Sequence, residues 1–523
     1  RTFDELWSVL DGLSLSDVSL WLDAGSATAP VASALAARLR EGGEQEARLR
    51  GGWGDDPLGQ LAASGTIGEG LGRRLALTGR LAEWSRRVAP GMRVVDVSTQ
   101  PYTEAGADAA QELGIALATG VTYLRALERA GLPWDASCGQ LAFTVTAAGD
   151  LFMDVAKLRA LRRGWSRVLA ACGGTAGDGA AYVHLRSTRR KRTRRDPWVN
   201  MLRATGESAA AAIGGADAVT VLPFDAAWGA PGELGRRIAR NTPLILSEES
   251  HLEHVVDPAD GCWYLESLTE ELLRAGWRLL QEIEEEGGMG AALLSGSVQH
   301  RVGQTAAKRL AKIARRQAAV TGVSSYPNLD EEPLEPIVEK RRDLRDRAAA
   351  SAEDLPEDLR EQVGGLRDAL ASPAPGTGEL EVLARVLERG APLAAVTEVL
   401  AEHGEAARAE KLIAWRDGEP FEALRDQSDR WRAEHGREPE VFVAAVGSLA
   451  RIKPRIDFTA NLLAAGGLRP RAPEACFAGP EEALEAFAAA GAPLAALVAA
   501  DGDYPELVPE LAPGTVVILD NLA

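Results

Sequence analysis

The feature that most constrains the fold is a regular alternation of short apolar runs and amphipathic segments over residues 1–330. Apolar runs predict buried strands at Val18–Asp23, Met92–Ser98, Tyr182–Leu185, Ala218–Leu222 and Pro243–Leu246. Helical spacing of apolar residues predicts helices at Val31–Arg40, Ala105–Ala130, Arg203–Ile213, Leu234–Arg240 and Leu268–Glu286. Strands that alternate with helices form parallel sheets through right-handed crossovers. With this many units, a closed (β/α)8 barrel of the TIM type is favoured over an open sheet.

A second α/β pattern follows a change of composition. Residues 331–437 are rich in Glu, Arg and Pro and predict a helical linker region, with helical pieces at Pro336–Ala350, Asp358–Leu370, Leu380–Leu387 and Leu393–His403 and a polar stretch at Gly418–Arg437. In residues 438–523 we expect strands at Val441–Val446, Leu494–Ala499 and Val516–Leu519, with helices at Ile456–Ala465 and Pro480–Ala490. This order predicts a small, doubly wound, flavodoxin-like domain.

Charge and composition exclude several classes of partner. The chain has 58 Lys and Arg against 76 Asp and Glu, a net charge of −18 that disfavours nucleic acid. No apolar run reaches the roughly 18 residues that a membrane span needs. The four cysteines are scattered without a CxxC pair, which is typical of a protein in a reducing cytoplasm. Because the chain begins at Arg1 rather than Met, we expect that an N-terminal segment precedes it.

Six short motifs occur in a fixed order between residues 103 and 289. They are TEAGA at Thr103–Ala107, FMDVAKLRA at Phe152–Ala160, TRRDPWVN at Thr193–Asn200, IARNT at Ile238–Thr242 with EES at Glu248–Ser250, DPADGCWYLE at Asp257–Glu266, and GGM at Gly287–Met289. Together they resemble the acyl-CoA mutase family, whose best-known member is the cobalamin-dependent methylmalonyl-CoA mutase. The segment PFEALRDQSD at Pro420–Asp429 resembles one that family members carry just before their B12 domain. The resemblance implies a barrel that holds an acyl-CoA, followed by a B12-type domain.

The C-terminal domain lacks the group that the family uses to bind cobalt. Family members carry a His in a DxHxxG turn after the first strand of this domain, and its Asp orients that imidazole. Here Gly447 takes the place of the Asp and Leu449 takes the place of the His. The last histidine of the chain is His435, so no other alignment supplies an imidazole. A leucine cannot bind cobalt, and we expect no cobalamin on this chain.

The barrel lacks the family's substrate-binding histidine. The segment Ser98–Ala107 aligns without gaps to the family's SGYHMQEAGA, which places Pro101 at the His that hydrogen-bonds the substrate's thioester carbonyl. Proline has no side-chain donor and cannot polarise a carbonyl. The family's QTSGWSLT segment is replaced by the basic stretch Arg186–Thr193. We therefore expect no catalytic, cofactor-binding or metal-binding residue in this chain.

Two further clusters allow alternative interpretations. The basic run Arg186–Arg195 could bind the phosphates of the CoA nucleotide, because Arg matches phosphate geometry. A charged barrel-end loop that pairs with acidic neighbours or with a partner subunit is favoured over that site. His251 and His254 stand three residues apart near Glu248 and Glu249, a spacing compatible with a metal site. Structural hydrogen bonding is the favoured role of both histidines.

The resemblance implies a role within a pair of subunits, because the family includes heterodimers of one active and one degenerate chain. We expect a stabilising partner of a catalytic large subunit of methylmalonyl-CoA mutase. The complex would convert (R)-methylmalonyl-CoA to succinyl-CoA, with adenosylcobalamin and the acyl-CoA bound on that partner. One alternative is an enzyme that turns over an acyl-CoA by itself. Another is a non-enzymatic scaffold or chaperone of another acyl-CoA mutase.

Overall fold

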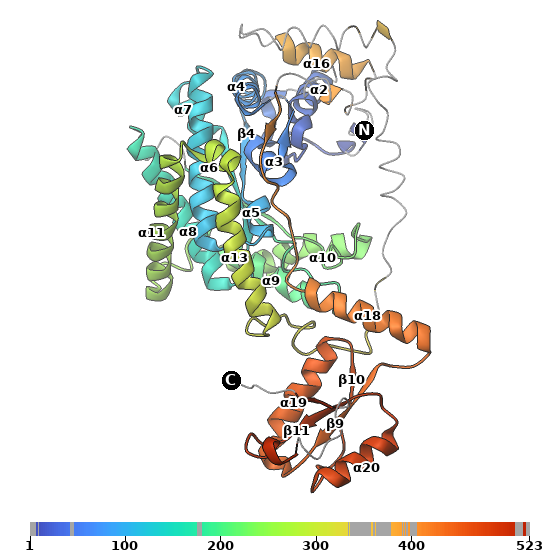
Figure 1. Ribbon diagram of the computed structural model, residues 1–523. Helices are drawn as coiled ribbons and strands as arrows, with labels where there is room; N and C mark the ends of the chain where they lie inside the picture. Colours follow the sequence, from blue (N-terminus) through green and yellow to red (C-terminus); the bar gives the residue numbers. More distant parts are fainter. Residues whose placement is uncertain are drawn as a thin grey trace.

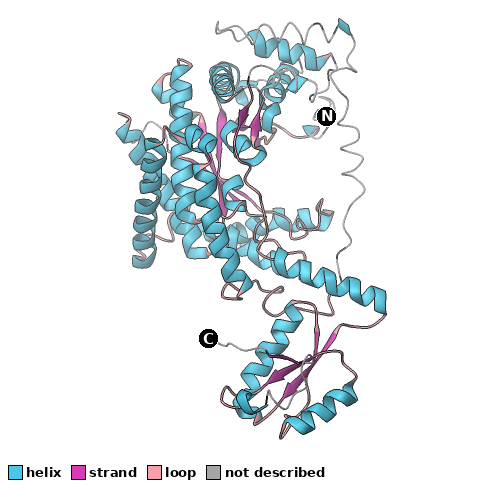
Figure 2. Cartoon of the chain, in the orientation of Figure 1, coloured by secondary structure: helices cyan, strands magenta, loops and turns pink. Residues whose placement is uncertain are grey.

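The computed structural model describes residues 7–334, 378–397, 405–507 and 516–518, together with 357, 358 and 361. Short gaps within these ranges fall at residues 9, 42–45, 69, 175–179, 333, 390, 392, 394 and 395. A large α/β body and a smaller one are joined through a long helix, α18 (Glu419–His435) (Figures 1 and 2).

The large body is built on a six-stranded parallel sheet. Its strands are β1 (Ser19–Trp21), β2 (Arg50–Asp55), β4 (Met92–Ser98), β5 (Leu141–Ala147), β6 (Tyr182–Ser187) and β7 (Ala218–Thr220), in the spatial order β1-β2-β4-β5-β6-β7. The sheet curls, because the rings of Trp21 on β1 and Tyr182 on β6 stack at 4.8 Å although three strands separate them in the sheet. The described residues thus form a half-barrel, and the closed eight-stranded barrel remains a prediction.

Helices cover the outer face of this sheet (Figure 1). They are α2 (Thr28–Glu41), α3 (Pro57–Ser64), α4 (Leu71–Val88), α6 (Ala109–Arg129), α7 (Trp134–Gly139), α8 (Leu151–Ala171), α9 (Val199–Ile213), α11 (Trp263–Glu285), α12 (Met289–Ser295) and α13 (Ser297–Ala314). Helices α6 and α11 approach closely, because a Cβ at Gly114 would lie 2.8 Å from the carbonyl oxygen of Gly276. Helix α16 (Gly378–Glu388) returns to pack against α2.

The strand predicted at Pro243–Leu246 is wrong. These residues belong to the end of α10 (Glu233–Leu244) and to the π-helical turn η3 (Ile245–Glu249). A short apolar run does not by itself distinguish a strand from a helix. Leu244 and Ile245 are about half exposed, at 49% and 48%, so the run lacks the burial that would hold it in a parallel sheet.

The small body contains a four-stranded parallel sheet in the order β10-β9-β11-β12. Its elements are β9 (Glu440–Ala445), α19 (Leu449–Ala465), β10 (Arg469–Arg471), α20 (Pro480–Ala490), β11 (Ala495–Val498), α21 (Tyr504–Leu507) and β12 (Val516–Ile518). Alternate residues of β9 pack on opposite faces, with Phe442 and Ala444 against α20 and Val443 and Ala445 against α19. This parallel arrangement supports the flavodoxin-like assignment, which stays a prediction.

The linker region contributes α18 and the short strand β8 (Ala407–Arg408), which pairs antiparallel with β3 (Thr66–Ile67). The helices predicted within residues 336–370, and most of the one at Leu393–His403, lie outside the described residues. The polar stretch at Gly418–Arg437 forms α18. An apolar cluster that includes Val323, Phe421 and Ala465 holds the two bodies together.

Four short segments complete the described elements: η1 (Gly25–Ala27), η2 (Glu46–Arg48), α5 (Gln100–Glu104) and η4 (Leu252–His254). None of the helices described here is both long enough and apolar enough to span a membrane.

Candidate functional site

A cavity of about 550 Å³ opens at the carboxyl ends of the strands of the half-barrel. Charged and polar residues in its lining are Asp23, Asp56, Gln60, Asp96, Ser98, Gln100, Glu104, Arg186 and Lys411. The carboxyl ends of barrel strands carry the active sites of barrel enzymes, because the loops that follow the strands converge there. The position of the cavity therefore makes it the candidate site.

Asp56 is the most constrained carboxylate of this cavity. It follows β2 and caps the N-terminus of α3, where its Oδ1 accepts from the backbone N–H of Gly59 at 3.0 Å. The Tyr123 hydroxyl donates to the same oxygen at 2.6 Å, and the backbone N–H of Ser98 donates to Oδ2 at 3.2 Å. Burial raises the pKa of Asp56 to about 7 despite these donors, and the nearby carboxylate of Asp96 raises it further.

Asp96 projects from β4 toward the same cavity. Its Oδ1 accepts from the Thr144 hydroxyl at 2.7 Å. Burial raises the pKa of Asp96 to about 6, and the Arg186 guanidinium opposes that change only in part. The sequence analysis did not identify Asp56 or Asp96. The pattern Asp-Asp-Pro at 55–57 is a helix-start signal that could have indicated Asp56.

The raised pKa of Asp56 predicts that the chain loses stability as pH increases. The folded state holds the proton up to about pH 7, whereas the unfolded chain releases it near pH 4. Between these values the unfolded state binds fewer protons, so the free energy of unfolding falls with rising pH, by up to about 4 kcal/mol. Urea unfolding of the wild type and of Asp56→Asn at pH 5 and pH 8 measures this. The variant should show a smaller difference between the two pH values, and an equal difference would contradict the assignment.

Aromatic side chains fill the interior of the half-barrel on the amino-terminal side of the cavity. Tyr182, His184 and Arg186 alternate along β6 and therefore share its inner face, with Arg186 at the cavity. Trp21 stacks on Tyr182, and the Arg93 guanidinium lies 5.1 Å from the centroid of the Tyr182 ring. A Cβ at position 52 would lie 2.4 Å from the Trp21 ring, which explains Gly52 on β2. These side chains therefore bridge β1 and β6 across the curve of the sheet.

His184 takes part in this filling and carries no charge at neutral pH. Its Nε2 lies 2.7 Å from the Thr220 hydroxyl, and the centroid of its ring lies 6.2 Å from that of Trp21. Burial lowers the pKa of His184 to about 4, and the Arg186 guanidinium lowers it further. The ring packs as a neutral polar group on the inner face of β6.

Pro101 lines the cavity at the start of α5, directly after β4. The side chain at this position faces the cavity without offering a hydrogen-bond donor. Glu104, one turn later, accepts from the Gln100 side chain at 2.8 Å and from the backbone N–H of Arg189 at 3.4 Å. The segment aligned with the family's substrate-binding histidine therefore does reach the cavity, and at the aligned position Pro101 offers no side-chain hydrogen-bond donor.

A buried ion cluster holds the segment behind Pro101. The Lys157 ammonium on α8 lies 2.7 Å from Glu112 Oε2 and 3.2 Å from Asp154 Oδ1, and it donates to the carbonyl oxygen of Thr146. Glu112 Oε1 accepts from the Thr99 hydroxyl at 2.6 Å, which fixes the start of α5. The three charged side chains are each at least 98% buried.

The basic run Arg186–Arg195 pairs with acidic neighbours, as favoured from the sequence. Its ion pairs are Arg186–Asp23 at 3.3 Å, Arg190–Asp417 and Lys191–Asp417 at 2.9 Å, Arg192–Glu207 at 2.5 Å, Arg194–Asp426 at 2.6 Å, and Arg195–Asp429 at 2.6 Å. Most of these carboxylates belong to α18 or the segment before it. The run therefore anchors the linker on the barrel.

The histidine pair considered as a metal site forms a stack. The rings of His251 and His254 lie 4.7 Å apart and nearly parallel, at 15°. The described residues include no group of three or more His, Cys, Asp or Glu side chains that could hold a metal ion. Parallel stacking of two rings is not the arrangement of two ligands converging on one ion.

The loop after β9 does not fit the ligation of cobalt. Gly447 takes a left-handed conformation (φ +117°), and Leu449, which is 48% exposed, begins α19. The resemblance aligns these residues with the Asp and His of the family's turn, and neither side chain offers an atom that binds a metal. No step involving a corrinoid is assigned to this chain.

A curled parallel sheet with a cavity at the carboxyl ends of its strands defines an α/β protein of the half-barrel type. The family model described as Methylmalonyl-CoA mutase matches residues 1–405. The methylmalonyl-CoA mutase small subunit of Streptomyces virginiae is 41% identical over 497 residues, which cover 95% of this chain and 69% of that protein. The chain therefore belongs to the methylmalonyl-CoA mutase family.

Other relatives have the same or a broader name. The methylmalonyl-CoA mutase small subunit of Propionibacterium freudenreichii subsp. shermanii is 38% identical over 259 residues, 49% of this chain and 41% of that protein. The methylmalonyl-CoA mutase of Escherichia coli (strain K12) is 28% identical over 468 residues, 85% of this chain and 64% of that protein. The similarity to proteins named small subunits extends across most of the chain.

Proposed function

We propose that this chain is the non-catalytic small subunit of a heterodimeric methylmalonyl-CoA mutase. A catalytic large subunit of the same fold would isomerise methylmalonyl-CoA to succinyl-CoA, with adenosylcobalamin bound on that subunit. The observation that carries the proposal is Pro101, which lines the cavity where the family places a histidine. The names of the relatives support a small subunit that has a larger partner.

The chemistry of the cavity also argues against turnover in this chain. Four carboxylates, from Asp23, Asp56, Asp96 and Glu104, line it against the two cations Arg186 and Lys411. Like charges disfavour the approach of a substrate that carries its own carboxylate. The stacked Trp21 and Tyr182 side chains lie within the curve of the sheet, where they would obstruct a long acyl-CoA chain.

The contribution of this chain would be structural. Bound adenosylcobalamin supplies radical chemistry, and this subunit would hold its partner in the competent conformation by burying surface. A buried interface that forms only with the folded partner stabilises that partner by mass action. We therefore expect the large subunit to lose stability and activity when it is purified without this chain.

Co-expression with a large subunit tests the proposal. The complex and each chain alone would be compared by mass in solution, by corrinoid absorbance and by mutase turnover. We expect a one-to-one complex, with corrinoid and turnover present in it and absent from this chain. Turnover or stoichiometric corrinoid in this chain alone would overturn the proposal. Failure to associate with a methylmalonyl-CoA mutase large subunit would also overturn it, and binding to another acyl-CoA mutase would favour the scaffold instead.

The variant Pro101→His provides an internal control. It restores an imidazole at the cavity but leaves Trp21 and Tyr182 in place and adds no cobalt ligand. We expect the isolated variant to remain inactive. The turnover of the complex should change by less than about twofold, because the proposal places the chemistry on the large subunit; a tenfold change would correspond to about 1.4 kcal/mol. Gain of turnover in the isolated variant would show that the filled interior does not exclude substrate.

A further inference from the structure

A second cavity, of about 440 Å³, lies between the N-terminal parts of α8 and α9 and the loop at residues 319–321. Its lining includes Leu151, Lys191, Val199, Leu202, Arg203 and Val320. None of its lining residues is shared with the first cavity. No part of the proposed function uses it.

Arg203 on α9 is a half-buried cation of this cavity that forms no ion pair with another described residue. Its Nη1 donates to the Thr193 hydroxyl at 3.0 Å and to Asn200 Oδ1 at 2.7 Å, and its Nη2 donates to the carbonyl oxygen of Thr321 at 2.7 Å. All three acceptors are neutral. A guanidinium has five N–H donors, so two remain without a partner among the described residues.

Each carboxylate that lines the same cavity has a cationic partner, and Lys157, the partner of Asp154, is shared with Glu112. Asp154 pairs with Lys157 at 3.2 Å, Glu207 with Arg192 at 2.5 Å, and Asp417 with Arg190 at 2.9 Å. Burial lowers the pKa of Arg203, and the neighbouring Arg192 lowers it further, so the site disfavours an additional positive charge. An anion in the cavity would relieve both effects.

Part of the cavity wall is apolar. Leu151, Val199, Leu202 and Val320 surround the opening, and Leu202 is 72% exposed on α9. An exposed leucine beside a partly buried cation forms an amphipathic surface, which suits a ligand with one charged end and one apolar end. Two free N–H donors on one guanidinium match the two oxygens of a carboxylate.

We propose that this cavity binds a monocarboxylate with a short apolar chain, with its carboxylate on Arg203 and its chain against Leu202 and Val320. The site lies outside the half-barrel and is independent of the proposed subunit role. Such a ligand would bridge α9 and the loop at residues 319–321, which Arg203 already joins through Thr321.

The binding of four small probes to the full chain tests both parts of the proposal, the carboxylate on Arg203 and the apolar chain against Leu202 and Val320. Hexanoate carries charge and chain, hexan-1-ol carries the chain alone, inorganic phosphate carries negative charge alone, and hexylammonium carries the opposite charge. By titration calorimetry we expect saturable binding of hexanoate at least about tenfold tighter than that of the other three, as for a hydrogen bond to a charged group. Equal binding of hexanoate and hexan-1-ol, or of hexanoate and phosphate, would overturn the assignment.

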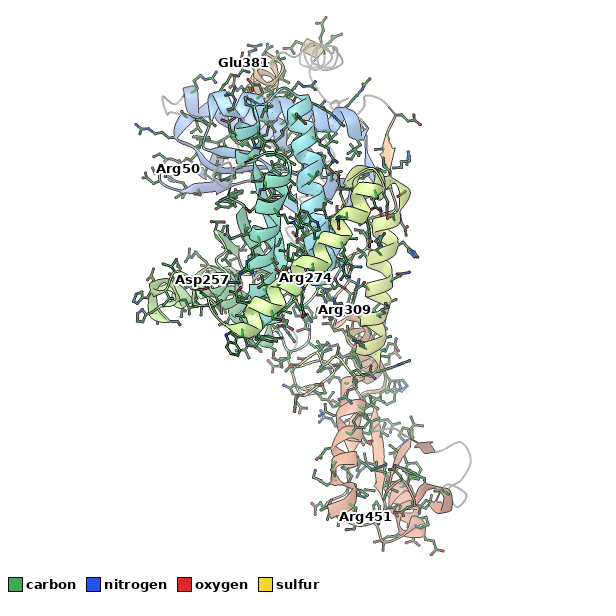
Figure 3. All side chains as sticks on the ribbon, turned by 90° about the vertical axis from the view of Figure 1, so that its left-hand side faces the viewer. Arg50, Asp257, Arg274, Arg309, Glu381 and Arg451 are labelled. Atoms are coloured by element: carbon green, nitrogen blue, oxygen red, sulfur yellow. The ribbon has the colours of Figure 1, made fainter. Side chains whose placement is uncertain are left out.

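Variants locate the site. Arg203→Met should weaken hexanoate at least about tenfold, whereas Arg274→Met, on the outer face of α11 (Figure 3), should leave it unchanged. Because Arg203→Met removes structural bonds as well, Leu202→Ser provides a test that leaves the core untouched. It should weaken hexanoate severalfold without weakening acetate, which is too short to reach the leucine. Unchanged hexanoate affinity in both Arg203→Met and Leu202→Ser would refute the site.

Discussion

Replacing Lys157 with methionine is expected to lower the free energy of unfolding by about 3–5 kcal/mol, because it leaves buried carboxylates without their cation. Lys157 is 1% exposed and contacts both Glu112 and Asp154. The two carboxylates that remain would face each other in a protein interior without compensation. Urea unfolding followed by circular dichroism measures the change, and a fall in soluble yield is expected with it.

A matched control is Lys453→Met, which removes a lysine from an exposed ion pair with Asp457 on α19. Such pairs contribute no more than about 1 kcal/mol. If the two variants unfolded at the same urea concentration, the cluster around Lys157 would not be a determinant of stability. The start of α5, and with it the position of Pro101, would then need another support.

Breaking the buried ion pair Arg192–Glu207 is expected to cause the second large loss of stability. Both side chains are at least 98% buried, and the Arg192 Nη2 lies 2.5 Å from Glu207 Oε2. Replacing Glu207 alone with leucine should cost about 3–5 kcal/mol, because an unpaired guanidinium stays in the interior. Replacing both residues, with Arg192→Met and Glu207→Leu together, should recover most of that loss, since well-packed apolar residues replace buried ion pairs at little cost.

The double variant separates charge from packing. If the single and the double variants were equally destabilised, the loss would come from a packing defect and not from an unpaired charge. Each variant is compared with the wild type by urea unfolding at pH 7, where both side chains are charged in the unfolded chain. The result also decides how the basic run acts, because Arg192 is its most buried member.

The basic run illustrates a local signal that only the tertiary structure explains. Seven Lys and Arg residues between 186 and 195 resemble a polyanion site when considered alone. Their partners Asp417, Asp426 and Asp429 lie more than 200 positions later in the chain. The fold brings them together because α18, which lies between the two bodies (Figure 1), and the segment before it pack beside the basic run. The net charge of the whole protein favoured this outcome.

Several elements were predictable because they depend on local patterns. The strand at Met92–Ser98 and the helix at Pro480–Ala490 are confirmed with the same bounds, since alternation of apolar residues and a helix-starting proline are local properties. The strand β2 was not predicted. Its sequence RGGWGD has no apolar alternation. A side chain at Gly52 would meet the ring of Trp21 on the neighbouring strand, and one at Gly51 would meet the backbone of Leu20.

The sequence by itself indicated the family. It also indicated that the family's substrate-binding histidine and cobalt-binding histidine are replaced here. Ordered motifs indicated the family, and a residue type such as Pro101 or Leu449 rules out hydrogen-bond donation or cobalt ligation in any fold. Only the tertiary structure decided which charged groups are buried and which side chains contact one another. Desolvation raises the pKa values of Asp56 and Asp96. Contact between distant segments stacks Trp21 on Tyr182 and places Arg203 beside the carbonyl oxygen of Thr321. These quantities depend on three-dimensional neighbours, which a linear pattern does not specify.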